Sequence, residues 1–169
     1  MLCGMSFKDA LLLSIHNSTN IVDGFAGDLD RRQLHHRPVA GANCAAWVLG
    51  HLIDVEHHAL IRLNLATETD LPPLPFDDFH DRFGRDEAAA SREDYGEAEL
   101  LPELFVATRK AMTKAVEVAD VKKLHAPLPK PHPRGDTSGE LLLFFTLHAT
   151  LHAGQLTTIR RSLGLPIKV

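Results

Sequence analysis

Two histidines near the end of the chain, His148 and His152, lie four residues apart in a stretch of helical periodicity. On a helix this spacing places the two imidazoles one turn apart on the same face, where they can bind one cation together. A third histidine, His51, occupies an apolar row of another predicted helix. Together the three side chains predict a site for a divalent metal ion between two helices.

The alternative for each histidine is a partly buried ring that bonds a backbone carbonyl. Leaving a buried polar group unpaired costs about 1–3 kcal/mol, whereas one metal ion would satisfy a nitrogen of all three rings at once. We therefore favour metal binding over three separate structural roles. The role of His58, as an outer group or a pocket wall, stays open. The remaining histidines lie on polar faces or in predicted loops and are interpreted as solvated: His16, His35, His36, His57, His80, His125 and His132.

Three imidazole ligands leave a coordination position for water or substrate, which is typical of catalytic rather than structural zinc sites. Such an ion lowers the pKa of bound water to about 7, so hydrolysis or group transfer is feasible. Ala149 stands where the helical metalloprotease signature has its glutamate base, which disfavours proteolysis. Asp54 and Glu56 are candidate bases, but we interpret both as solvated helix charges. Gln155 is either a partner of a ligating imidazole or a core amide.

The elements that position these residues are predicted to be helices. Apolar residues recur at three- and four-residue spacing in four stretches, and none alternates long enough for a convincing strand. Gly24 and Gly27 are expected to end the first helix, and Thr137 with Glu140 forms a capping box for the last. Arg160 is interpreted as complementing the dipole of that last helix. The expected helices run from about Phe7 to Val22, from the N-cap Asn43 to about Ala66, from about Ala98 to Ala119, and from Thr137 to about Leu163.

Two proline-rich connections, from Thr67 to Gly96 and from Pro127 to Pro133, separate the second, third and fourth helices. A loop as long as the first is often functional, so it either covers a pocket or crosses the surface to join two helices. The pattern predicts an all-α four-helix bundle with long connections between helices 2 and 3 and helices 3 and 4. Residues 1–169 are expected to form a single domain.

Composition disfavours several classes of protein. A net charge of -4 without a Lys/Arg stripe argues against nucleic acid as a partner. The longest apolar runs fall far short of the roughly 20 residues that a membrane-spanning helix needs. The first twenty residues lack the pattern of a signal peptide, and Cys3 and Cys44 make no disulfide framework. We therefore expect a cytoplasmic protein without membrane or nucleic-acid partners.

Three motifs resemble a known family: Trp47 to Leu52 (WVLGHL), His148 to Leu156 (HATLHAGQL) and Arg160 to Pro166 (RRSLGLP). In these motifs and in element order, the chain resembles the DinB-like, or YfiT-like, metal-dependent proteins over nearly its whole length. The resemblance implies a four-helix bundle, frequent homodimers, and a nickel- or zinc-type ion on His51, His148 and His152. Some relatives look like transferases or isomerases that use a low-molecular-weight thiol, which a metal ion would activate as thiolate.

Two functional hypotheses from different classes follow. The first is a metal-dependent enzyme, with thiol S-transferase-like or hydrolytic activity on a small molecule in the bundle cleft. The alternative is a non-catalytic stress-response protein that binds a metal or a small ligand. If the histidines are merely structural, the purified protein should contain no stoichiometric metal. The residue pattern assigns no catalytic residue.

Overall fold

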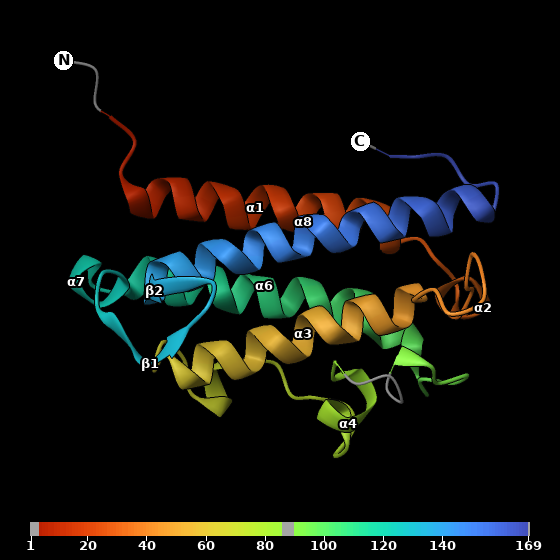
Figure 1. Ribbon diagram of the computed structural model, residues 1–169, viewed down its shortest axis with the longest axis horizontal. Coiled ribbons are helices and arrows are strands. Elements are labelled where there is room, and N and C mark those ends of the chain that lie inside the picture. Colours follow the sequence, from red (N-terminus) through yellow and green to blue (C-terminus); the bar gives the residue numbers. More distant parts are fainter. Residues whose placement is uncertain (1–3, 86–89, 169) are drawn as a thin grey trace.

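Four long helices form a bundle in the computed structural model, which describes residues 4–85 and 90–168. Helices α1 and α8 run in one direction and α3 and α6 in the other (Figure 1). Each of α1 and α3 packs against both α6 and α8, so α1 and α3 occupy opposite corners of the bundle. The predicted four-helix bundle is therefore confirmed. The long helices are α1 (Phe7–Ala26), α3 (Ala45–Arg62), α6 (Leu101–Val118) and α8 (Ser138–Ser162).

The connection between α3 and α6 is a crossover, because it returns the chain to the end of the bundle where α3 begins (Figure 1). Its middle part, α4, packs against α3 and contributes to the core. The shorter elements are α2 (Arg31–Leu34), η1 (Glu68–Asp70), α4 (Phe79–Phe83), η2 (Ala98–Leu100), α7 (Val121–Leu124), β1 (Pro127–His132) and β2 (Gly135–Thr137). The long connection is therefore partly structured and covers one face of α3.

Several predicted boundaries were wrong. The first helix continues through Gly24 and ends at Ala26, because Phe25 and Ala26 are buried and hold the last turn in place. The helix that carries His51 has Cys44, not Asn43, as its N-cap, and it ends at Arg62 rather than near Ala66. Cys44 is a buried free thiol, and Cys3 lies outside the described residues.

The second proline-rich connection contains an antiparallel hairpin of β1 and β2, where no strand was expected. Prolines at alternate positions leave the intervening N–H groups free to pair in a two-stranded ribbon, which explains why the segment tolerates them. The hairpin leads directly into α8. The predicted capping box of Thr137 and Glu140 starts that helix, and Gly164 after its end adopts a φ of 72°.

Arg160 is fully buried, so its interpretation as a group that only complements the helix dipole was wrong. Its guanidinium donates to the carboxylate of Asp28 and to the backbone carbonyls of Phe25 and Pro166. These bonds tie the end of α8 to the end of α1 and to the following tail. No described helix combines the length and the hydropathy that a membrane-spanning segment needs.

Gly50 lets the long connection approach α3 closely. A side-chain carbon added at Gly50 would lie 2.1 Å from Cδ1 of Phe83. The Phe83 ring is fully buried, with its centroid 4.6 Å from that of Phe79 and 5.4 Å from that of Tyr95. Because both neighbours confine the ring, Phe83 cannot move aside without disturbing the core.

We expect Gly50→Ala to lower the free energy of unfolding by about 1–3 kcal/mol, because overpacking forces Phe83 and its neighbours out of place. Gly154→Ala is the matched control, since a carbon added there meets nothing within 4 Å. On an exposed helical surface that change should raise the free energy by about 0.5–1 kcal/mol. Urea denaturation followed by circular dichroism measures both; equal effects of the two substitutions would contradict the close approach.

Candidate metal centre

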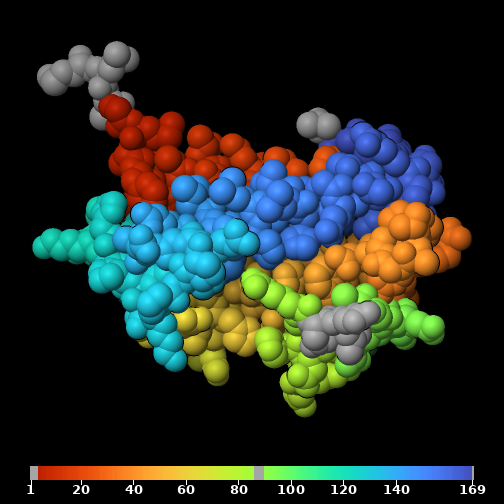
Figure 2. All heavy atoms as spheres, in the orientation of Figure 1, coloured from red at the N-terminus to blue at the C-terminus, as the bar shows by residue number. Residues whose placement is uncertain are grey.

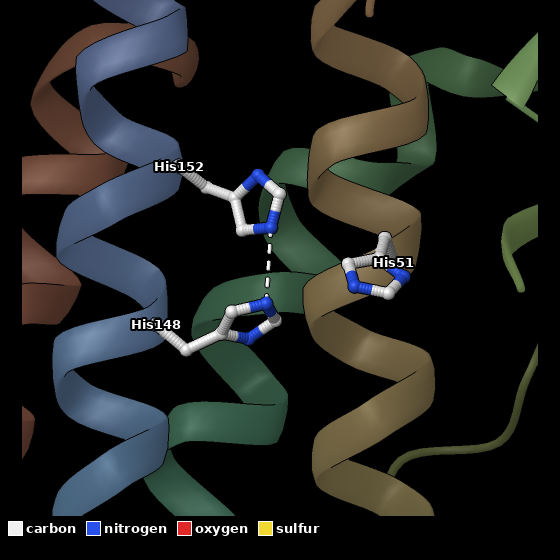
Figure 3. A group of neighbouring side chains, drawn as sticks. All are labelled: His51, His148 and His152. Carbon is white, nitrogen blue, oxygen red and sulfur yellow. Dashed lines mark hydrogen bonds between the residues drawn. The ribbon is translucent and has the colours of Figure 1, made fainter. Parts of the chain in front are cut away.

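Three imidazoles from two helices converge in the middle of the bundle (Figure 3). His51 comes from α3, and His148 and His152 come from successive turns of α8. The Nε2 atoms of His148 and His152 are 3.0 Å apart, and the His51 ring centroid lies 5.3 Å from each of theirs. One ligand-type nitrogen of each ring lies within 4.8 Å of the other two. The structure therefore brings the three predicted residues together.

Hydrogen bonds to Nδ1 orient two of the rings. His51 Nδ1 lies 3.0 Å from the carbonyl oxygen of Phe83, and His152 Nδ1 lies 3.2 Å from Oε1 of Gln155. Since both acceptors are oxygens, each Nδ1 carries the proton and each Nε2 keeps its lone pair. The prediction that Gln155 bonds an imidazole is confirmed, and the core-amide alternative is wrong because Gln155 is exposed. This tautomer is the one that a metal ligand needs at Nε2.

Aromatic rings enclose the histidines. Trp47 stacks on His51 with centroids 4.6 Å apart and an interplanar angle of 7°. Phe144 stacks on His148 with centroids 5.7 Å apart and an interplanar angle of 18°. The Nδ1 of His148 is buried and has no hydrogen-bond partner among the described residues. This nitrogen therefore bears the cost of burial without a hydrogen bond.

Burial keeps these imidazoles neutral. It lowers the pKa of His51 to about 4 and the pKa of His148 to about 3, and it also lowers the pKa of His152. The positive charge of Arg85 acts in the same direction on all three pKa values. At neutral pH the cluster therefore presents lone pairs rather than charges. Three neutral imidazoles with converging nitrogens fit a divalent ion such as zinc or nickel.

A second cluster of polar side chains lies one turn along α3. Asp54 is buried, and its carboxylate lies 3.0 Å from Nδ1 of His80 and 3.3 Å from Nδ1 of His58. The interpretation of Asp54 as a solvated charge was wrong, because the long connection folds over this face of α3 and places His80 against it. Both imidazole rings are exposed. With Nδ1 held by Asp54, Nε2 of His80 can accept a proton.

Glu56, the other candidate base, lies against α6. It is fully buried, and its carboxylate lies 3.4 Å from the guanidinium of Arg109. Burial raises the pKa of Glu56, and Arg109 opposes that change. Its interpretation as a solvated charge was wrong because α3 is covered on nearly all sides. His57 is buried for the same reason, and burial lowers its pKa to about 4. The other histidines interpreted as solvated are at least partly exposed: His16, His35, His36, His80, His125 and His132.

A pocket of about 420 Å³ lies next to the three histidines. Two of its lining residues connect it to them. Asp54 follows His51 by one helical turn, and Phe144 stacks on His148. Asp54 and His80 both line the pocket, whereas the three histidines are not among its lining residues, so the pocket borders the cluster without containing it. Sequence periodicity could not reveal this pocket, because its walls come from α3, α8, the hairpin and the segment after α4.

Comparison with known proteins places this geometry in a family. YfiT from Bacillus subtilis, described as a probable metal-dependent hydrolase with an unusual four-helix bundle topology, has a similar structure with a TM-score of 0.66. The two chains are 17% identical, and the match covers 94% of this chain and 89% of YfiT, which shows a shared fold. No curated protein matches significantly. The model of the DinB superfamily matches residues 15–156, a span that contains all three histidines, and the chain therefore belongs to the DinB superfamily.

Proposed function

We propose that the chain is a metal-dependent enzyme that acts on a small molecule, with hydrolysis as the favoured reaction. The observation that carries this proposal is the convergence of three neutral imidazoles beside a pocket. His51, His148 and His152 would hold the ion. YfiT is described as a probable metal-dependent hydrolase, which agrees with this class of activity. Zinc or nickel as the metal, a homodimer and a cytoplasmic location stay predictions.

The protein's own groups have separable roles in this proposal. The carbonyl of Phe83 and the amide of Gln155 hold His51 and His152 through Nδ1, so that Nε2 of each ring is the nitrogen that keeps a lone pair. A bound divalent ion would supply Lewis-acid chemistry, lowering the pKa of a water or thiol that it binds. His80, oriented by Asp54, offers its other ring nitrogen, Nε2, for proton uptake. Water or a low-molecular-weight thiol could serve as the attacking group.

The first test is the metal content of protein purified without an affinity tag. We expect about one divalent ion per chain, and its loss in His51→Ala and in His148→Ala, because two remaining imidazoles bind the ion weakly. His16→Ala is the matched control, since this exposed ring bonds only Asn20. Plasma mass spectrometry measures the metal, and circular dichroism checks folding. A wild-type protein without metal, or folded variants that retain it, would refute the site.

Metal affinity should be nearly constant between about pH 7.5 and about pH 6 and should fall steeply below about pH 5. Protons compete with the ion only near the pKa of each free imidazole, which burial lowers to about 4 for His51 and about 3 for His148. Ordinary histidines, with a pKa of about 6.5, would lose affinity from neutral pH downwards. Competition with a chromophoric chelator measures the affinity, and a steep decline already at pH 6 to 7 would oppose this account.

Turnover separates an enzyme from a metal-binding protein without activity. We expect the metal-loaded chain to cleave a small activated ester such as 4-nitrophenyl acetate, measured by release of nitrophenolate. Activity should disappear on metal removal and in His148→Ala, and it should persist in His16→Ala. Activity that requires an added thiol would identify transfer rather than hydrolysis. A fully loaded chain that turns over neither reaction would favour the non-catalytic alternative.

A further inference from the structure

The pocket beside the three histidines is lined by an unusual number of basic groups. Arg62 extends from the last turn of α3, Arg85 follows α4, and His132 ends β1. Arg134, at the turn of the hairpin, lies with its guanidinium 5.3 Å from the ring centroid of Phe144, which also lines the pocket. Figure 2 shows the hairpin in cyan against the yellow end of α3. Three separate segments therefore bring positive charge to one place.

The arginines of this pocket have no carboxylate partners among the described residues. Elsewhere Arg82, Arg109 and Arg160 each lie within 4.0 Å of an Asp or Glu oxygen. Neither Arg62 nor Arg85 has such a contact in residues 4–85 and 90–168. Burial lowers the pKa of His132, and the charges of Arg62, Arg85 and Arg134 lower it further. Arg62 and Arg85 thus have no ion-pair partner within the described fold.

Asp54 is the single carboxylate among the lining residues that the structure describes. Its carboxylate lies 3.0 Å from Nδ1 of His80 and 3.3 Å from Nδ1 of His58, and the His58 Nδ1 also bonds the backbone carbonyl of Asp54. It therefore lies against these two imidazoles, and it makes no ion pair with Arg62 or Arg85 among the described residues. A guanidinium that faces a pocket without a partner is suited to a carboxylate or a phosphate, which it can bind through two parallel hydrogen bonds.

The rest of the pocket wall is apolar. Val55 of α3 and Leu63 just after it line the pocket together with Leu141, Phe144 and Phe145 of α8. A volume of about 420 Å³ is within the range of pockets for small molecules, which combine apolar walls with a few placed polar groups. Here the apolar part and the basic part of the wall lie side by side. A ligand with an apolar body and an anionic group would therefore match the pocket better than a purely apolar or a purely anionic ligand.

We propose that this pocket binds small molecules that carry a carboxylate or phosphate group on an apolar body, with Arg62 and Arg85 holding the anion. The assignment rests on the proposed function, because it defines the substrate class of the same cleft. The anionic end would lie between α3, the hairpin and the segment after α4. The apolar body would lie along Phe144 and Phe145, toward the metal centre.

The test is calorimetric titration of the full chain, zinc-loaded and metal-free, with phenyl phosphate, phenylacetate and the neutral phenylacetamide. We expect both anions to bind at least about tenfold more tightly than the amide, and less tightly at high salt. The single variant Arg85→Gln and the double variant with Arg62→Gln should each weaken anion binding by at least about tenfold, because a charge-assisted hydrogen bond is lost. Arg161→Gln, an exposed arginine outside the pocket, is the matched control. The tighter anion shows whether phosphate or carboxylate is preferred.

Anion binding that persists in the metal-free chain and depends on the two arginines supports the proposal. Equal binding of amide and anions would overturn it, and so would anion binding that needs zinc and ignores both arginine substitutions. If the proposed function were wrong but the anion site existed, the chain would lack stoichiometric metal and would still bind the anions. His51→Ala serves as a cross-check, because it should lose metal and keep the anion site.

Discussion

The hydrogen bond from His51 Nδ1 to the carbonyl of Phe83 links the bundle to the long connection that covers it. It fixes the tautomer of His51, and it exists only because Gly50 lets Phe83 lie directly on the backbone of α3. The same connection places His80 next to Asp54 and Arg85 at the pocket. The crossover between α3 and α6 is therefore a structural part of the site, not merely a link between two helices.

Covering α3 on nearly all sides has an energetic consequence, because polar side chains on that helix become buried. Glu56 meets Arg109, and Asp54 meets two imidazoles, so neither carboxylate is left without a cationic or hydrogen-bonding neighbour. Pairs of this kind add little net stability over an apolar core, but losing one partner is costly. The three central histidines are at least partly buried and have no ion-pair partner among the described residues. They stay neutral, and a shared cation would compensate their burial.

The histidine cluster and the adjoining pocket present two kinds of binding determinant. Neutral imidazoles with free Nε2 atoms suit a soft or borderline divalent ion, whereas the unpaired arginines suit an oxyanion. Phe144 connects them, since its ring stacks on His148 and also lines the pocket. A ligand anchored by its anionic group at the hairpin would therefore extend toward the histidines. Such positioning by a remote group is a common source of effective catalysis.

The sequence by itself determined the helices and the residues of the histidine cluster. Period-3.6 apolar rows, the Thr137–Glu140 capping box and the His148–His152 spacing are local signals, and local geometry makes them reliable. Tertiary structure alone decided that Asp54, Glu56 and His57 are buried, that Phe83 orients His51, and that Arg62 and Arg85 share a pocket. These facts depend on how a long irregular connection and a hairpin fold back onto the bundle. Helical periodicity describes one helix at a time and contains no information about which distant segment will cover it.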